Sequence, residues 1–335
     1  MTVRIGINGF GRIGQLVMRA SYRRSDVEVV AINATKTPGY VKYQLGHDTV
    51  HPEFCHQVEA TEEGLVVDGR KISMTSERDP RLIPWGKLGV DFVVDATGNF
   101  KTIKDASAHL DAGAKKVVIT APSPDAPTFV MGVNEDRYDD SMDIVSNASC
   151  TTNALAPLAK VLNDGWGIDG GIVTAVHAVT ASQSVQDGNR GGGNWRLGRA
   201  AMSNIIPSST GAAKTIGKVI PSLDGILNGT SLRVPVLNVS CIDFNVVLKT
   251  SATYEQICEE VARASQEEMS GILGYTEDAV VSSDFIHDAR SAIFDAGAGM
   301  QLQSSKLTKL LAWYDNEWAY SCRVIDLIHH MASQS

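Results

Sequence analysis

Short apolar runs alternate with amphipathic stretches through the first half of the chain. Five of these runs carry few polar residues, as strands buried on both faces of a parallel sheet do; they are 3–8, 27–33, 90–95, 114–120 and 143–146. Helical periodicity over 15–22 and 101–110 separates some of them. Strands that alternate with helices in this way predict a parallel α/β sheet. The segment 58–74 instead alternates and turns at Asp68-Gly69, which predicts an inserted antiparallel hairpin.

The pattern changes after residue 150, where a helix is predicted from Cys150 through 154–162. Later strand-like runs have no regular helices between them; they are 171–179, 231–234, 239–248 and 307–314. Such runs predict a second domain with a mainly antiparallel sheet. We also expect a helix over 253–266 and a last helix near 317–332, which returns to the first domain. The predicted domains are therefore 1–149 and 150–316, with 317–335 as the returning helix.

Composition narrows the class of protein further. The chain has 335 residues, 43% of them hydrophobic, and no apolar run approaches the roughly 20 residues that span a membrane. Because residues 1–8 lead directly into a strand, we expect no signal peptide and a cytoplasmic location. Five cysteines without paired spacing predict neither disulfides nor a metal site. A net charge of −8 disfavours nucleic acid as a ligand.

A glycine motif follows the first predicted strand and opens a helix. It reads Gly9-Phe10-Gly11-Arg12-Ile13-Gly14, and in this context glycines let the backbone approach a pyrophosphate that the helix N-terminus stabilises. Thr97, Gly98 and Thr120 lie at the carboxyl ends of later strands, the edge where such sheets bind ligands. We therefore predict a Rossmann-type dinucleotide-binding domain followed by an α+β catalytic domain.

The end of the second strand leaves the choice of dinucleotide open. A carboxylate normally stands there to bind the adenosine ribose, but this chain has Asn33-Ala34-Thr35-Lys36. Ala34 does not repel a 2′-phosphate, and Thr35 and Lys36 could hold one. NAD and NADP both fit this sequence.

Cys150 is the candidate nucleophile, because a sulfur on the first turn of a helix is favoured as a thiolate. Its partner would be a base, and His177 on the run 171–179 is the candidate, although spacing alone does not single it out among eight histidines. A thiolate beside a nicotinamide implies attack on an aldehyde, hydride loss from the hemithioacetal and a thioester. Thr180, Thr210 and Arg233 would suit a phosphate, but Thr210 could equally cap a helix and Arg233 could be a surface charge.

The sequence resembles the glyceraldehyde-3-phosphate dehydrogenase family over essentially its whole length. The likeness is carried by 7–14, 146–153, 204–214 and 313–318, with Ser149-Cys150-Thr151-Thr152-Asn153 the most specific motif. It implies that Cys150 is the nucleophile, that His177 is its partner, and that phosphate releases the acyl group as 1,3-bisphosphoglycerate. It further implies that the substrate and inorganic phosphate are bound by Ser149, Thr151, Thr180, Thr210, Gly211 and Arg233. Implied cofactor contacts include Arg12, Ile13, Arg78, Thr120 and Asn316, and the implied assembly is a homotetramer.

Several residues depart from the pattern of that family. The usual Asp, Cys and Gly are replaced by Ala34, Ala154 and Ala319, and Asn189 with 190–193 forms an unusual loop. These changes favour either a specialised isoform that tolerates a thiol-directed inhibitor or drift in a duplicated copy. Two other functions remain open: an erythrose-4-phosphate dehydrogenase on the same scaffold, and a non-catalytic regulatory paralogue.

Overall fold

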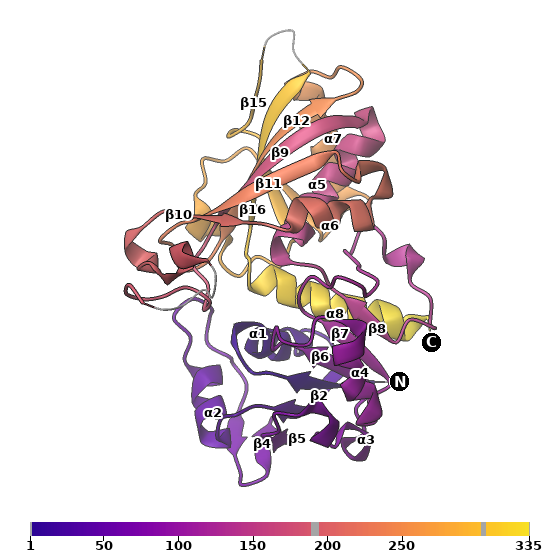
Figure 1. Cartoon of the computed structure of the whole chain (residues 1–335), viewed down its shortest axis with the longest axis vertical. Helices are drawn as coiled ribbons and strands as arrows, with labels where there is room; N and C mark the ends of the chain where they lie inside the picture. The colour runs from indigo at the N-terminus through magenta and orange to yellow at the C-terminus, as the bar shows by residue number, and fades with distance from the viewer. Residues whose placement is uncertain (1, 189–193, 303–305, 335) are drawn as a thin grey trace. The chain divides into compact units, whose positions relative to one another are not determined.

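The computed structural model describes residues 2–188, 194–302 and 306–334. The chain divides into two compact units, one formed by residues up to 149 together with those from Ser321 on, and the other by Cys150–Tyr320. Figure 1 labels the helices and strands of both units. The unusual loop at Asn189 and 190–193 lies outside the described residues.

The first unit is built on a sheet whose central strand is β1. Its strands run in the order β3-β4-β5-β2-β1-β6-β7-β8. The parallel members are β1 (Val3–Asn8), β2 (Val27–Asn33), β5 (Arg70–Thr75), β6 (Phe92–Asp95), β7 (Lys116–Ile119) and β8 (Ile144–Ser146). The helices are α1 (Arg12–Ser21), α2 (Pro38–Gly46), α3 (Trp85–Leu88) and α4 (Ile103–Asp111). The parallel α/β sheet predicted from the apolar runs is confirmed.

The inserted hairpin is confirmed, but it has one more strand than predicted. β3 (Val58–Ala60) and β4 (Gly64–Val67) pair antiparallel, and β4 also pairs antiparallel with β5. The turn between β4 and β5 places Asp68 at φ 47° and Gly69 at φ 78°, the left-handed conformation that two-residue hairpins favour. The pattern did not separate β3, whose three residues are too short to show alternation.

A buried polar network lies under the carboxyl edge of this sheet. The Trp85 indole donates to Nδ1 of His109 (3.1 Å), and His109 Nε2 lies 3.1 Å from a carboxylate oxygen of Asp95. Because an indole can only donate, His109 carries its proton on Nε2 and donates it to Asp95. The other Asp95 oxygen accepts from the backbone N–H and hydroxyl of Thr97. The network thus fixes the strand end on which Thr97 lies.

The second unit begins with α5 (Cys150–Trp166) and contains the other sheet, in the order β10-β11-β9-β12-β16-β14-β13. Its strands are β9 (Ile168–His177), β10 (Ile206–Ser209), β11 (Leu227–Arg233), β12 (Ser240–Leu248), β13 (Leu273–Thr276), β14 (Ala292–Asp295), β15 (Met300–Gln301) and β16 (Leu307–Tyr314). Neighbouring strands of this sheet pair antiparallel, except β9 with β11 and β13 with β14, which pair parallel. The mainly antiparallel sheet is confirmed, while the short strands β10, β13, β14 and β15 escaped prediction.

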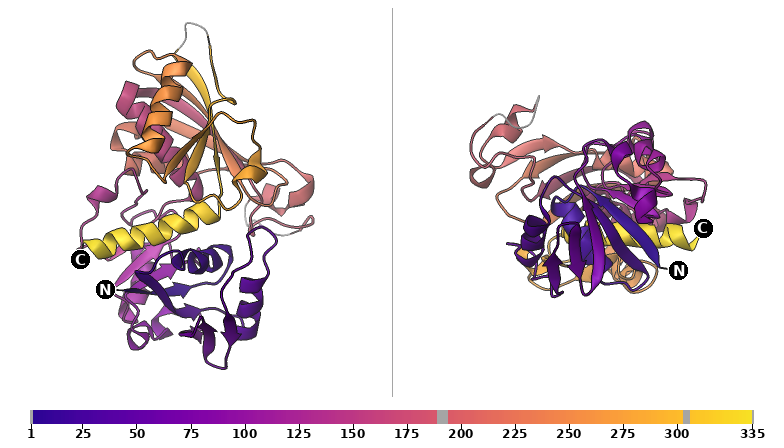
Figure 2. Two further views of the ribbon diagram at one scale, coloured as in Figure 1. Left: turned by 180° about the vertical axis from the view of Figure 1, so that it is seen from behind. Right: turned by 90° about the horizontal axis from the view of Figure 1, so that it is seen from below.

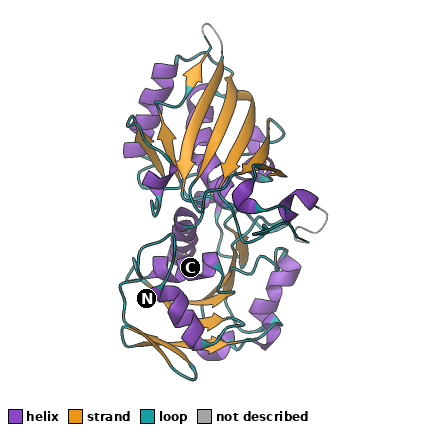
Figure 3. Cartoon of the chain, turned by 90° about the vertical axis from the view of Figure 1, so that its left-hand side faces the viewer, coloured by secondary structure: helices purple, strands orange, loops and turns teal. Residues whose placement is uncertain are grey.

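Helices cover one broad face of this second sheet. With α5 they are α6 (Ala212–Val219) and α7 (Tyr254–Gln266), and Figure 2 shows α7 from the helical side. Figure 3 shows the opposite face of the strands, which none of the described helices of this unit covers. Short 3₁₀ turns complete both units: Pro80–Leu82, Glu135–Arg137, Trp195–Gly198, Ala201–Ser203, Pro221–Leu223 and Ser282–Phe285.

The last helix, α8, spans Trp318–Ser333. From Ser321 on it belongs to the first unit, where Arg23 donates to the sulfur of Cys322 (3.4 Å) and Arg24 pairs with Asp326 (3.5 Å). Within the described ranges, no helix is long and apolar enough to cross a membrane.

Candidate active site

The glycine motif of the first unit has the backbone that a dinucleotide requires. Gly9 adopts φ 92°, a conformation that side chains disfavour. A Cβ on Gly14 would stand 2.1 Å from the carbonyl oxygen of Gly9, so only glycine lets α1 approach this turn. A Cβ on Gly11 would meet nothing within 4 Å. The turn is therefore tightly packed inside and open in front of the N-terminus of α1, where a pyrophosphate binds in this fold.

A pocket of about 520 Å³ opens at this edge of the sheet. Of the predicted cofactor residues, it is lined by Gly9, Gly11, Asn33, Ala34, Arg78 and Thr97. Arg12, Ile13, Gly14, Gly98 and Thr120 are not among its lining residues, and Asn316 belongs to the other unit. The Thr120 hydroxyl donates to the Asp95 carbonyl (2.9 Å), so it ties β7 to β6.

Asn33 is committed to the framework of this pocket. Its amide nitrogen donates to Asn8 and to the Glu77 carbonyl (both 2.8 Å). Its amide oxygen accepts from Thr75 (2.9 Å) and from the Glu77 N–H (2.8 Å). Because these four bonds use the capacity of the amide, we assign Asn33 a role in holding the pocket together rather than in binding the cofactor directly.

Ala34 and Lys36 line the pocket at the end of β2, where this fold usually carries a carboxylate. Ala34 is buried, and Lys36 lies beside it along the same wall. The Lys36 ammonium donates to the Phe10 carbonyl (3.2 Å) and to Gln44 (2.8 Å), which holds it next to the glycine turn. The one carboxylate in the lining belongs to Glu77, at the end of β5.

Asp48 is a residue that sequence reasoning missed. Both of its oxygens accept from Arg12, the first residue of α1, at 2.5 and 3.3 Å. One oxygen also accepts the backbone N–H groups of Val50 and His51. The pKa of Asp48 is well below its usual range because these hydrogen bonds outweigh the effect of burial. A lone aspartate in the sequence gave no sign of this pairing, since Arg12 and Asp48 are 36 residues apart.

In the second unit, Cys150 is the first residue of α5. The chain reaches it through Ala148, whose φ of 56° is unusual for a residue with a side chain. Cys150 Sγ lies 3.6 Å from Nε2 of His177. Burial raises the pKa of the thiol, although Thr151 and the charge of Arg233 oppose the shift. The helix start alone favours a thiolate, and burial acts against that effect in the free protein.

His177 ends β9 and is buried. Burial and the charge of Arg233 lower the pKa of His177 to about 4, so the imidazole is neutral at pH 7. Arg233 ends β11 and pairs in register with His177, which places its Nη1 2.7 Å from Nδ1 of the imidazole. The structure therefore brings together the thiol, the imidazole and the guanidinium that sequence analysis named separately.

Two further residues support this cluster. The Tyr314 hydroxyl lies 3.0 Å from the hydroxyl of Thr151, and the Ser240 hydroxyl donates to Asn316 (2.8 Å) while accepting the Ala178 N–H (3.0 Å). Tyr314 and Ser240 are hydrogen-bonded in register on β16 and β12. Neither role was predicted from the sequence, because the alternation of apolar and polar residues predicts the strands but not which buried hydroxyl faces the site.

The remaining predicted anion-binding residues lie on three different segments. Ser149 directly precedes α5, and Thr180 follows β9, where its hydroxyl lies 2.9 Å from that of Ser182. Thr210 accepts the Ala212 N–H at the start of α6 (3.2 Å), and Gly211 is exposed beside it. Among the described residues, no hydrogen bond joins Thr210 or Gly211 to Cys150.

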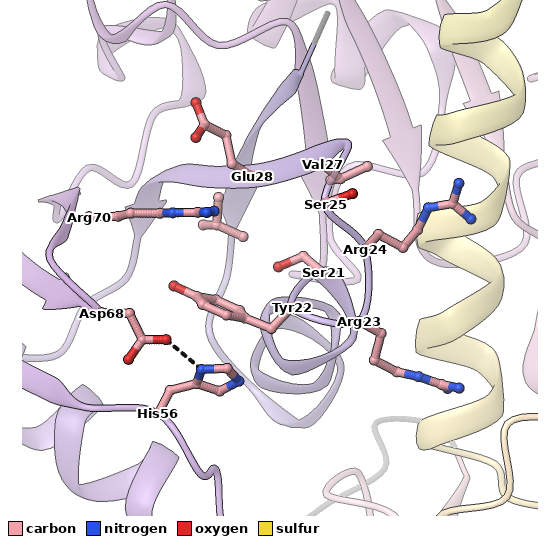
Figure 4. A pocket seen from close by; sticks show the side chains of 11 residues that line it. Ser21, Tyr22, Arg23, Arg24, Ser25, Val27, Glu28, His56, Asp68 and Arg70 are labelled. Carbon is pink, nitrogen blue, oxygen red and sulfur yellow. Dashed lines mark hydrogen bonds and ion pairs between the residues drawn. The ribbon is translucent and has the colours of Figure 1, made fainter.

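A second pocket in the first unit lies at the other edge of the parallel sheet (Figure 4). Tyr22, His56 and Arg70 line it, and His56 Nδ1 lies 2.6 Å from Asp68. It is formed by the C-terminal end of α1 and the start of β2, whereas open α/β sheets bind ligands at the carboxyl ends of their strands. We therefore assign it no part in the site. In the part of the chain that the structure describes, no three His, Cys, Asp or Glu side chains gather as metal ligands.

A dinucleotide-binding sheet followed by a helix that presents a cysteine to an imidazole is an arrangement expected of a dehydrogenase. Comparison with known proteins agrees with this class. The family described as glyceraldehyde 3-phosphate dehydrogenase, NAD binding domain, matches residues 3–103, and its C-terminal domain matches residues 149–316. The chain therefore belongs to the glyceraldehyde-3-phosphate dehydrogenase family, as the sequence motifs indicated.

Curated relatives extend the match to the full length of the chain. A glyceraldehyde-3-phosphate dehydrogenase of Wickerhamomyces ciferrii is 54% identical over 336 residues, which cover all of both chains. Glyceraldehyde-3-phosphate dehydrogenase 3 of Saccharomyces cerevisiae is 54% identical over 98% of this chain and 99% of its own. Glyceraldehyde-3-phosphate dehydrogenase 1 of Mucor circinelloides f. lusitanicus is 55% identical over 99% of this chain and 98% of its own.

Proposed function

We propose that this protein oxidises D-glyceraldehyde 3-phosphate to 1,3-bisphosphoglycerate with NAD or NADP and inorganic phosphate. The observation that carries the proposal is the 3.6 Å contact between Cys150 Sγ and His177 Nε2 at the start of α5. We assign dinucleotide binding to 1–149 and catalysis to 150–316. Because the glycine turn is open in front of α1, the first unit fits a dinucleotide that supplies the hydride acceptor when bound.

Cys150 and His177 carry the covalent chemistry in this proposal. The sulfur attacks the aldehyde carbon, and the hemithioacetal hydroxyl gives its proton to Nε2 of His177 as hydride leaves the carbon. The thioester that remains on Cys150 is then attacked by inorganic phosphate, which restores the thiolate. Asn316 is held by Ser240, and we assign it to the nicotinamide amide.

The substrate phosphate and inorganic phosphate are both dianions that need donors. Arg233 supplies a guanidinium next to His177, and hydroxyl and backbone donors come from Ser149, Thr151, Thr180, Thr210 and Gly211. We assign the binding of both phosphates to this set of donors.

Initial rates with two sugars and two cofactors test this function. Glyceraldehyde 3-phosphate is expected to be oxidised faster than erythrose 4-phosphate. Multiple turnovers are expected only when inorganic phosphate is present. A preference for erythrose 4-phosphate would favour the alternative dehydrogenase. Absence of any thioester on Cys150 with cofactor and either aldehyde would favour a non-catalytic regulatory paralogue.

The residues that line the pocket at the end of β2 favour the use of NADP as well as NAD. Ala34 presents no carboxylate to repel a 2′-phosphate, and the Lys36 ammonium stands on the same wall. Glu77 also lines the pocket, and we assign its carboxylate as an acceptor for a ribose hydroxyl. We therefore propose that the protein uses both cofactors.

Ala34→Asp is expected to shift selectivity towards NAD by about 1–3 kcal/mol, the scale of a charged hydrogen bond. The new carboxylate would accept from the ribose hydroxyls and repel a 2′-phosphate. The measurement is the ratio of kcat/KM for NAD to that for NADP. Ala34→Asn serves as the matched control, because it adds the same volume without the charge. An unchanged ratio in Ala34→Asp would show that the end of β2 does not control the choice.

We propose that the second unit carries the contacts of a homotetramer. Large apolar side chains are exposed on it, including Val185 (83%), Trp195 (88%) and Ile205 (66%). Ile172, on β9, is also exposed (63%). We propose that these exposed apolar side chains contribute to the contacts between copies of the chain. Light scattering is expected to give four times the mass of 35.9 kDa, and the monomer mass at micromolar concentration would contradict the proposal.

A further inference from the structure

A carboxylate is buried at the end of β6, below the dinucleotide pocket of the first unit. It belongs to Asp95, the last residue of the strand, which is 1% exposed. Among the described residues, no lysine or arginine pairs with it, and its one ion-pair contact is with the ring of His109. Burial of a charged group is unfavourable unless hydrogen bonds satisfy it. The hydrogen bonds of Asp95 must therefore replace the water that folding removes.

Four donors converge on the Asp95 carboxylate. Oδ1 accepts the backbone N–H of Thr97 (3.1 Å) and its hydroxyl (2.7 Å). Oδ2 accepts from the amide nitrogen of Asn8 (2.9 Å) and from Nε2 of His109 (3.1 Å), which carries the ring proton because the Trp85 indole donates to Nδ1. The Asn8 nitrogen also lies 3.4 Å from His109 Nε2, so these two donors stand side by side at one oxygen.

The orientation of the Asn8 amide is fixed from the other end of the network. The backbone of Glu77 donates to the amide oxygen of Asn33 and accepts from its amide nitrogen. Asn33 therefore turns its nitrogen towards the amide oxygen of Asn8 (2.8 Å). Asn8 is left with its nitrogen facing Asp95. All four bonds thus have one direction, with the carboxylate as the acceptor.

Two of the residues that donate to Asp95 line the dinucleotide pocket. Asn8 and Thr97 are among its lining residues, whereas Asp95 is not. The Thr97 hydroxyl also accepts the Asn99 N–H (3.1 Å). It thereby ties the end of β6 to the turn at Gly98, which adopts φ 69°. The buried carboxylate consequently holds two strand ends, those of β1 and β6, in the wall of the pocket.

We propose that Asp95 is a positioning residue for the cofactor, which sets the places of Asn8 and Thr97 from below the pocket. The inference rests on the proposed function, in which residues 1–149 bind NAD or NADP. A carboxylate only accepts, so it satisfies all four donors at once. An amide in the same place has one accepting oxygen, and its nitrogen faces two donors. These donors move away from the amide, and the pocket wall loses the arrangement that fits the dinucleotide.

Asp95→Asn is expected to weaken the binding of NAD and of NADP about tenfold, the scale of a buried donor left without its acceptor. The loss is the same for both cofactors, because Asp95 acts on the ends of β1 and β6 and not on Ala34 at the end of β2. Isothermal titration calorimetry of the full-length protein with each dinucleotide measures the two dissociation constants. Thermal unfolding without ligand measures the stability of the same preparations.

Two other roles of Asp95 predict different results. If its negative charge acted only on the nearby anionic dinucleotide, its removal would tighten the binding of both cofactors. If Asp95 only stabilised the fold, Asp95→Asn would lower the unfolding temperature and leave both dissociation constants unchanged. Either result overturns the proposal. Val93→Ala is the matched control: it removes buried methyl groups from the same strand and is expected to lower the unfolding temperature without changing either dissociation constant.

A pair of substitutions at Thr97 tests the same network and decides alone if Asp95→Asn fails to fold. Thr97→Val keeps the shape of the side chain but removes the hydroxyl that donates to Asp95, so binding of both cofactors is expected to weaken about tenfold. Thr97→Ser keeps this hydroxyl and loses only a methyl group, and it is expected to bind both cofactors as the unmodified protein does. Equal affinities of the two variants would contradict the proposal.

Binding by the unmodified protein separates failure of this inference from failure of the proposed function. If the unmodified protein binds NAD or NADP and the Asp95→Asn and Thr97→Val proteins bind them equally well, only the positioning role is wrong. If the unmodified protein binds neither dinucleotide, the proposed function is wrong and the positioning role with it.

Discussion

Cys150→Ser is expected to lower kcat for glyceraldehyde 3-phosphate oxidation by at least about 10⁴-fold. The serine hydroxyl is far less acidic than a thiol, and a neutral imidazole at 3.6 Å does not ionise it. A thioester is replaced by an oxygen ester, which phosphate attacks more slowly. Steady-state rates with saturating cofactor and substrate measure the loss.

Cys55→Ser is the matched control for this variant. Cys55 is exposed in the first unit, so its replacement removes a thiol of the same chemistry without touching the cluster around His177. Its kcat is expected to stay within twofold of the unmodified protein. Comparable turnover in Cys150→Ser and Cys55→Ser would remove Cys150 from the mechanism.

His177→Asn is expected to lower kcat by roughly 10²–10⁴-fold, the usual contribution of a positioned base. Burial and Arg233 lower the pKa of His177 to about 4, so in the free protein the ring is neutral above that pH. The base form is thus present at pH 7 and is lost as pH falls. In the unmodified enzyme, kcat/KM should therefore fall on the acid side, and in His177→Asn this acid limb should disappear.

The pH profile distinguishes a base from a residue that only fills space. Asparagine keeps hydrogen-bonding groups but does not titrate, so a purely structural role for His177 would lower the rate equally at all pH values. His329→Asn, at a half-exposed histidine paired with Asp26 in the first unit, is expected to change neither kcat nor the profile. An acid limb that persists in His177→Asn would contradict the assignment of the base.

Much of the fold could be predicted from periodicity, because many of its strands and helices carry a clear pattern of apolar and polar residues. Apart from β5, the parallel strands of the first unit are mainly apolar, and Gly9 and Gly14 are required by a positive φ and by a 2.1 Å approach. The short strands β3 and β15 carry no apolar run or alternation by which they could be recognised. Their positions are set by pairing with longer neighbours, which local sequence does not record.

The residues of the site could be predicted from the sequence, but the contacts between them could not. Cys150 was recognisable from its helix start and His177 only with the family resemblance, because eight histidines share the chain. The pairing of His177 with Arg233 depends on the register between β9 and β11. The two residues are 56 positions apart in the sequence. The raised pKa of Cys150 depends on burial, and no local motif reports burial of a single side chain.

The most direct test of the account is a single-turnover experiment without inorganic phosphate. Enzyme is mixed with cofactor and glyceraldehyde 3-phosphate, and reduced cofactor is followed by absorbance while the protein is analysed by mass spectrometry. We predict a burst of one reduced cofactor per chain together with an acyl group on Cys150, which phosphate then removes. A burst with the acyl group on another residue, or steady turnover without any acylated protein, would contradict the account.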